Sequence, residues 1–312
     1  MVAEAGGASG VGLGLSDLTP DYRGSLALVE SERLRILELQ PELGTWKPIP
    51  LGDHYEFLAV HASSQGRDIA SPDPEHRRFA VKEHKQCMLF AHMVGASAFL
   101  LHPGHIYSPG NAAGIEEEED YPYIGSYYWE HPEQRWVRVE LFLESLSELA
   151  DFYRQEGFDY EVTIENLPFP NLGATTSELL SVCRLARLRL PLRMTLDVPH
   201  LWISRLLLRE NPWLKPYVEG YPDLRHSFYS GLEDFVTAHE RDIAYYHIYG
   251  TQGLREHLPV TRKKRYSADE LDLAKVARII GMDRPVILEV FNYPRPVLHE
   301  SVSNFETLQR AA

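Results

Sequence analysis

Two stretches decide the fold: YEVTIENLP, residues 160–168, and RMTLDVPH, residues 193–200. Each is an apolar run of strand length that ends in a carboxylate, Glu165 in the first run and Asp197 in the second, where His200 follows. Strand interiors avoid charge, so these carboxylates are unusual. Because side chains at the ends of successive strands share one space only when the strands are parallel neighbours, the two stretches predict one mouth of a barrel.

The same pattern extends over most of the chain. Eight apolar runs alternate with helix-like segments, and they lie at residues 11–16, 33–40, 56–62, 97–105, 160–168, 193–200, 242–250 and 285–291. Parallel strands joined by helical crossovers are typical of a (β/α)₈ barrel. A length of 312 residues with 44% hydrophobic content suits one such domain. We therefore predict an α/β fold, a single-domain TIM barrel.

The domain boundaries follow from the segments that break this rhythm. Residues 1–10 predict a flexible tail, and residues 11–312 predict the barrel domain. A long insertion, residues 106–137, follows the fourth strand, and it combines the acidic run Glu116–Asp120 with many aromatic residues. Long segments after strand ends are usually functional, so we predict that this one lies over the barrel mouth as a lid. A helix is predicted from Arg138 to Gln155.

Composition limits the possible functions. The formal net charge is −14, which disfavours a nucleic acid as partner without excluding it. No apolar run is long enough to span a membrane, and the first residues do not resemble a signal peptide. Only Cys87 and Cys183 occur, and both are expected to be reduced core thiols. We therefore expect a cytoplasmic protein, and the sequence does not indicate its oligomeric state.

Polar residues follow most of the predicted strands. Those at or near strand ends are His61, His102, Glu165, Asp197, His200, His247 and Glu289. At one barrel mouth these carboxylates would repel one another, and a divalent cation would remove the conflict. Mixed nitrogen and oxygen ligands suit Zn²⁺, Mn²⁺, Co²⁺ or Fe²⁺. In the second strand, Glu38 is interpreted only as part of an alternating pattern.

The other histidines have a simpler interpretation. They lie on helical or loop patterns, and all are expected to be solvated: His54, His76, His84, His92, His131, His226, His239 and His299. The basic run Arg262–Arg265 is interpreted as a solvated face.

Taken in order, the motifs HASSQ at His61, LLHPGH at His102, TIENLP at Glu165, LDVPH at Asp197, YYHIYG at His247, REH at His257 and ILEVF at Glu289 resemble the xylose isomerase-like TIM-barrel superfamily. This superfamily includes endonuclease IV, sugar isomerases and epimerases. The resemblance extends from about His61 to Phe291. It implies one to three divalent metal ions.

Similarity to the endonuclease IV branch implies a zinc phosphodiesterase that acts on abasic-site DNA. His61, His102 and Glu165 would hold one ion, and Glu165 would bridge to a second ion held by Asp197, His247 and Glu289. His200 and His257 would help to hold a third. That branch has an aspartate two residues before the histidine that corresponds to His257. This chain has Arg255 at that position, which puts the third site in doubt.

Similarity to the sugar isomerase and epimerase branch implies one metal held by Glu165, Asp197, His247 and Glu289. Glu165 and Glu289 would be the catalytic residues that exchange a proton with a carbon beside a carbonyl. His200, Arg255 and also His257 would bind the substrate. His61 and His102 are not required by this chemistry.

Charge decides the order of these hypotheses. A DNA substrate needs a cationic surface, whereas a small polyhydroxylated substrate does not. From the sequence we therefore place a metal-dependent isomerase or epimerase of a sugar-like substrate first. The endonuclease IV-like phosphodiesterase is the alternative, and a barrel that binds without catalysis is the third hypothesis.

Overall fold

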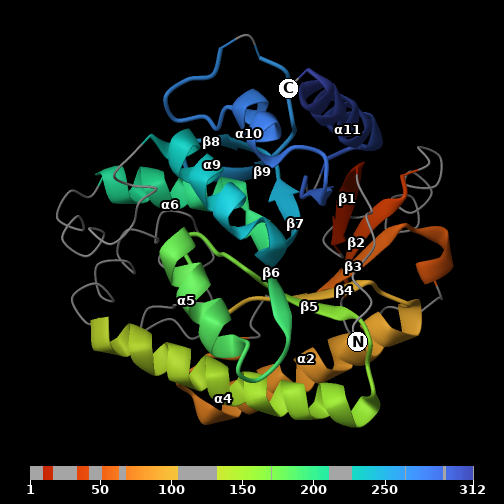
Figure 1. Ribbon diagram of the computed structural model, residues 1–312, viewed down its shortest axis with the longest axis vertical. Coiled ribbons are helices and arrows are strands. Elements are labelled where there is room, and N and C mark those ends of the chain that lie inside the picture. The colour runs from red at the N-terminus through yellow and green to blue at the C-terminus, as the bar shows by residue number, and fades with distance from the viewer. Residues whose placement is uncertain are drawn as a thin grey trace.

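The computed structural model describes residues 10–16, 34–41, 51–62, 68–104, 132–169, 171–210, 227–263, 265–290 and 293–311. Within these ranges eight parallel strands close into a barrel in the order β1-β10-β7-β6-β5-β4-β3-β2 (Figure 1). The barrel strands are β1 (Gly10–Ser16), β2 (Ile36–Gln40), β3 (Phe57–His61), β4 (Ala98–Leu101), β5 (Glu161–Glu165), β6 (Leu192–Asp197), β7 (Ile243–Ile248) and β10 (Pro285–Leu288). The predicted TIM-barrel fold is confirmed, and all eight strands lie where the apolar runs predict them.

Helices surround this ring of strands (Figure 1). They are α2 (Pro74–Val94), α4 (Pro132–Glu156), α5 (Thr176–Ala186), α6 (Val198–Glu210), α9 (Phe228–His239), α10 (Leu273–Ile280) and α11 (Arg295–Arg310), with short 3₁₀ helices η1 (Gly52–His54) and η4 (Glu240–Asp242). A separate antiparallel hairpin, β8 (Gly250–Gln252) and β9 (Arg255–Leu258), follows β7. The pattern of apolar runs did not predict this hairpin.

Two predicted boundaries differ from the structure. Helix α4 begins at Pro132 rather than at Arg138, so residues 132–137 belong to the helix and not to the insertion. Proline suits the first turn of a helix because its missing N–H is not needed there. Residues 106–131 of the predicted lid lie outside the described residues, and its position over the mouth stays a prediction. Gly10 already belongs to β1, and residues 1–9 of the predicted tail also lie outside the described residues.

Alternation along the strands divides their side chains between the helices and the barrel interior. One buried cluster fills the interior, and it comprises Ile36, Phe57, Ala59, Ala98, Leu100, Ala244, Tyr245 and Ile287. Five of these residues are followed, two positions later, by a polar residue that lies in the same strand or directly after it. These polar residues are Glu38, His61, His102, His247 and Glu289. The apolar layer is therefore the floor on which a polar layer lies.

Strand β1 leaves space inside the barrel because its inward positions are glycines. A Cβ atom at Gly12 would lie 2.3 Å from the carbonyl oxygen of Ile36, which is too close for any side chain. At Gly14 a Cβ atom would lie 3.5 Å from Cγ of Glu289. The short β1 side chains thus allow β2 and Glu289 to approach.

Among the histidines expected to be solvated, His84 is a correction. It is 3% exposed, and its Nδ1 atom donates to the carbonyl oxygen of Ala80 at 2.8 Å. It lies on the buried face of α2, three residues after Val81, and its own helix satisfies its ring.

The structure also describes most of the other histidines and both cysteines. The histidines at positions 54, 92 and 299 are exposed, those at positions 76 and 239 are partly buried, and those at positions 131 and 226 lie outside the described residues. Cys87 and Cys183 are buried free thiols. No helix in the described parts is long and apolar enough to cross a membrane.

Candidate metal centre

Four of the predicted ligands meet at the carboxyl end of the barrel. Glu165, Asp197, His247 and Glu289 come from the ends of β5, β6, β7 and β10, and one ligand atom from each lies within 4.8 Å of the others. Glu165 is 1%, Asp197 and His247 are 0%, and Glu289 is 4% exposed. The structure thus brings together four residues that the sequence separates by more than a third of the chain.

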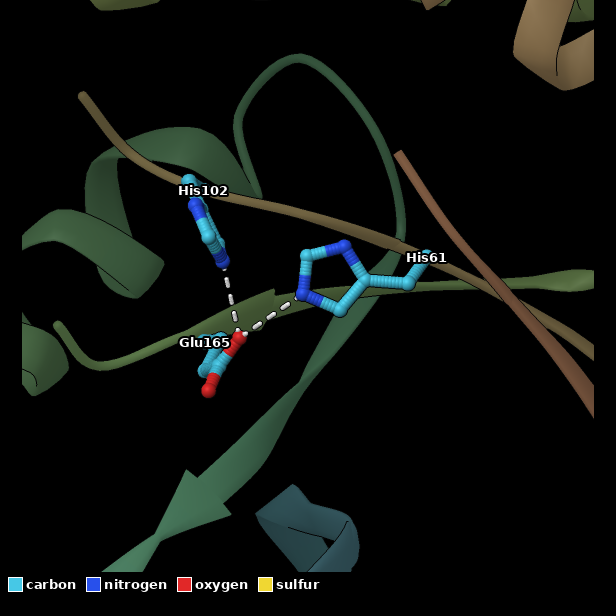
Figure 2. Close-up of side chains that lie close together, drawn as sticks. All are labelled: His61, His102 and Glu165. Atoms are coloured by element: carbon cyan, nitrogen blue, oxygen red, sulfur yellow. Dashed lines mark hydrogen bonds and ion pairs between the residues drawn. The ribbon is translucent and has the colours of Figure 1, made fainter. Parts of the chain in front are cut away.

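A second group contains His61, His102 and Glu165 (Figure 2). The Nε2 atoms of His61 and His102 lie 3.4 and 2.9 Å from Oε2 of Glu165. The other carboxylate oxygen, Oε1, lies 3.0 Å from Nδ1 of His247 in the first group. Glu165 therefore presents one oxygen to each group, which is the geometry of a bridging carboxylate.

A third group differs from the one that the sequence predicted. It contains His200, Glu256 and His257, and the two histidine Nε2 atoms lie 3.7 and 3.8 Å from the Glu256 carboxylate. Arg255, the predicted substrate-binding residue, has an exposed side chain and belongs to none of the groups. Glu256 was not predicted, and it supplies the carboxylate that the predicted third site lacked.

The backbone of β9 explains this exchange. His257 has a φ angle of 54°, the positive value that non-glycine residues seldom adopt. In a regular strand Glu256 and His257 would face opposite sides, but this left-handed residue breaks the alternation. Both side chains consequently point to His200, and Arg255 does not.

Three histidines present the same nitrogen to these groups. Nδ1 of His61, His200 and His257 donates to the carbonyl oxygens of Ala62, Asn166 and Glu289 at 2.7, 2.9 and 3.0 Å. A carbonyl only accepts, so each Nδ1 carries a proton, and each Nε2 is the nitrogen that faces the carboxylates and would bind a cation. Metal-bound histidines are usually oriented by such bonds.

Asp197 and Asn166 connect β5, β6 and α6. The Asn166 side chain donates to the carbonyl oxygen of Asp197 and accepts from its N–H, both at 2.8 Å. Oδ1 of Asp197 accepts from the backbone N–H of His200 at 2.6 Å and so caps α6. Oδ2 is buried and has no hydrogen-bond donor among the described residues. It lies 3.3 Å from Nδ1 of His200. Asp197 belongs to the four-residue group, so the donor set fits a divalent cation.

The charges of the centre influence one another strongly. Burial alone raises the pKa of Glu165, but positive charge on His247 and hydrogen bonds from His102 and His200 hold it well below its usual range. Burial and the neighbouring carboxylates raise the pKa of Asp197 well above its usual range. Burial and repulsion from Glu165 likewise raise the pKa of Glu289, although His247 opposes the shift. Without a cation, the group thus keeps protons that a bound ion would displace.

Metal binding is expected to release protons. Burial opposes protonation of His61 and His200, but nearby carboxylates outweigh it and raise their pKa values to about 9 and about 10. Both rings are therefore protonated at pH 7 without metal. Apparent affinity should rise with pH by about tenfold per unit for each displaced proton and level off above these values. Titration calorimetry of the apo-protein with Zn²⁺, in two buffers of different ionisation heat, measures the release. Identical heats in both buffers would contradict the expectation.

Family comparison agrees with this geometry. A family model described as xylose isomerase-like TIM barrel matches residues 51–310. The chain therefore belongs to the xylose isomerase-like TIM-barrel family. Among curated proteins, no sequence match is found.

Solved structures share the fold at low sequence identity. A D-tagatose 3-epimerase-like protein is 18% identical with a TM-score of 0.61, over 96% of this chain and 98% of that one. Endonuclease IV from Thermus thermophilus is 15% identical with a TM-score of 0.56, over 97% and 99%. The IOLI protein with a bound zinc atom is 14% identical with a TM-score of 0.55, over 96% of each chain. These likenesses establish the fold alone.

Proposed function

We propose that this protein is a metal-dependent phosphodiesterase that uses two or three divalent ions. The observation that carries the proposal is the fusion of ligand groups through Glu165, whose two carboxylate oxygens face His247 on one side and His61 with His102 on the other. A one-metal reaction needs only the four-residue group. The two additional groups are explained if the centre holds more than one ion.

This order reverses the one that the sequence favoured. The sequence placed Arg255 where an acidic ligand was expected, which argued against a third ion and suited a sugar-binding role. In the structure Arg255 is exposed, and Glu256 joins His200 and His257. This group supports the multinuclear hypothesis, because it places a carboxylate beside His200 and His257.

The residues of the centre suit hydrolysis because they would hold the metal ions at fixed positions. When bound, divalent ions activate water and stabilise the charge of a phosphodiester under attack. Glu165 fixes the spacing between the two groups, because its single side chain reaches both. The Nδ1–H bonds of His61, His200 and His257 orient their rings from backbone that does not move with the substrate. The nitrogen and oxygen donors suit Zn²⁺, Mn²⁺, Co²⁺ or Fe²⁺.

A metal-dependent sugar isomerase or epimerase is the second candidate. One observation favours it: Oε1 of Glu165 and Oε2 of Glu289 lie 3.0 and 3.4 Å from the same atom, Nδ1 of His247. Two carboxylates beside one metal could exchange a proton with a substrate carbon, and His200 could hold a substrate oxygen. The net charge of −14 also suits a small polyhydroxylated substrate better than DNA.

Activity assays of the wild-type protein and of one variant distinguish the two candidate functions. Purified protein loaded with Zn²⁺ or Mn²⁺ would be assayed on bis(p-nitrophenyl) phosphate, on abasic-site DNA at low salt, and on ketohexose epimerisation. We expect hydrolysis of a phosphodiester that chelator abolishes. His102→Gln, which removes one ligand of the three-residue group and leaves all four side chains of the other group in place, should reduce hydrolysis by about 100-fold or more.

Epimerisation that survives in the His102→Gln variant would replace the proposal by the second candidate. Protein that binds no metal at all would support the third hypothesis, a barrel without catalysis.

A further inference from the structure

Glu38 is a buried carboxylate that neither the motifs nor the family model includes. It lies on β2, before residue 51 where the family match begins, and it is 2% exposed. Strand alternation directs it into the barrel above Ile36, into the polar layer that also contains metal ligands. A charge at this depth is costly unless it is paired, so its partners should reveal its role.

Those partners are two donors on β7. Oε2 of Glu38 lies 3.1 Å from Nε2 of His247 and accepts a hydrogen bond from the Tyr245 hydroxyl at 2.8 Å. Tyr245 and His247 are two residues apart on one strand, so both point to the interior. Two side chains of β7 thus hold the Glu38 carboxylate beside the ring of His247, which belongs to the four-residue group.

Both nitrogens of His247 face carboxylates at 3.0–3.4 Å. Nδ1 lies 3.0 Å from Glu165 and 3.4 Å from Glu289, and so it points into the four-residue group. Nε2 points away from that group to Glu38. A ligand nitrogen must be unprotonated, so a ring that binds through Nδ1 must keep its single proton on Nε2.

We propose that Glu38 is a positioning residue that holds the proton of His247 on Nε2 and thereby prepares Nδ1 to bind metal. Carbonyl oxygens do this for His61, His200 and His257, whereas a carboxylate does it for His247. A carboxylate acceptor also makes the imidazole a stronger donor to the cation. The inference rests on the metal centre of the proposed function, but not on its substrate.

Direct coordination by Glu38 is the competing explanation. Glu38, His61 and Glu289 also bring one ligand atom each within 4.8 Å. However, Nδ1 of His61 donates to Ala62 and its Nε2 faces Glu165, so the ring of His61 already serves another group. Oε2 of Glu38 also has two donors. The contacts therefore favour orientation of His247 over coordination.

The first experiment compares zinc affinity by chelator competition in three variants with wild type. Glu38→Leu removes the acceptor and should weaken binding by about 10- to 100-fold. Glu38→Gln keeps an amide oxygen for Nε2–H and should restore affinity to within a few-fold of wild type. Tyr245→Phe is the matched control: it removes one donor to Glu38 but leaves the carboxylate, and it should also stay within a few-fold.

Three results would overturn the proposal. Unchanged affinity in Glu38→Leu would mean that His247 needs no partner. Equal losses in Glu38→Gln and Glu38→Leu would mean that the hydrogen bond is not what matters. The loss of one zinc per chain in Glu38→Gln, with the remaining affinity unchanged, would make Glu38 a ligand.

A second measurement uses the wild-type protein and therefore does not depend on whether a variant folds. In zinc-loaded wild type with ¹⁵N-labelled histidine, the His247 ring should carry its proton on Nε2 and show the metal shift on Nδ1. The opposite assignment would contradict the proposal. Neither experiment uses a substrate, so absence of phosphodiesterase activity leaves the inference intact. If no zinc binds to the four-residue group, both the metal centre and the inference fall.

Discussion

Replacement of Glu165 by glutamine should lower metal-dependent turnover by about 1000-fold or more. Its carboxylate is the side chain that the two groups share, and three histidines lie within 3.4 Å of its oxygens. Glutamine keeps the length, but it loses the negative charge and turns an N–H₂ group toward either His247 or the pair of His61 and His102. Steady-state rates with saturating Zn²⁺ or Mn²⁺, together with metal content per chain, measure the effect.

Glu161→Gln is the matched control for this prediction. Glu161 lies on the same strand, β5, at the opposite end, where it pairs with Arg193 at 3.4 Å. The same chemical change there should leave turnover within about twofold, because Glu161 lies at the opposite end of β5 and belongs to none of the ligand groups. If the Glu165→Gln variant retained wild-type turnover and metal content, the centre would not depend on a shared carboxylate.

Removal of metal should produce the largest change in stability. When the free metal concentration is 1000 times the dissociation constant, binding stabilises the folded state by about 4 kcal/mol. For a domain larger than about 150 residues this corresponds to roughly 5–15 °C in melting temperature. Chelator-treated protein should therefore unfold at lower temperature, and readdition of Zn²⁺ should restore the original value. Calorimetry of both forms at one pH makes the comparison.

The expected loss of stability has an electrostatic cause, the repulsion among the carboxylates of the metal-free protein. Glu165, Asp197 and Glu289 are all nearly inaccessible to water, and the pKa values of Asp197 and Glu289 are raised by burial and by mutual repulsion. A cation relieves that repulsion in the folded state, whereas an unfolded chain separates the carboxylates. Equal melting temperatures with and without metal would show that the folded protein does not prefer a cation here.

The barrel could be predicted because its strands are short and uniformly apolar. The polar ligands could be predicted where they end such a run, as Glu165 and Asp197 do. Glu38 failed this test because it lies within ILELQ, followed by Leu39, and so it was interpreted only as part of an alternating pattern. The signal was present, since Ile36 and Glu38 share one face, but the sequence does not reveal which face points inward.

The third group shows a different limit. The family resemblance implied an acidic ligand two residues before His257, where this chain has Arg255, whereas in the structure Glu256 lies beside His200 and His257. His257 has a positive φ angle, which breaks the regular alternation of β9. A single left-handed residue is not visible in the residue pattern. His200 shows a smaller shift: it was predicted after the strand end, and it lies in the first turn of α6, capped by Asp197.

The function hypotheses changed order for the same reason. Charge and the identity of Arg255 were properties of the sequence, whereas the joining of the groups through two oxygens of Glu165 is a property of the fold. The distances around Glu165 therefore outweighed the composition, although the acidic balance still argues for a substrate smaller than duplex DNA.

Anomalous diffraction at the zinc edge, from crystals of the metal-loaded protein, tests the central claim most directly. We predict one ion among Glu165, Asp197, His247 and Glu289, with Nδ1 of His247 as a ligand, and a second ion between His61, His102 and Glu165. The absence of an ion among these side chains, or ions only at the protein surface, would contradict the account.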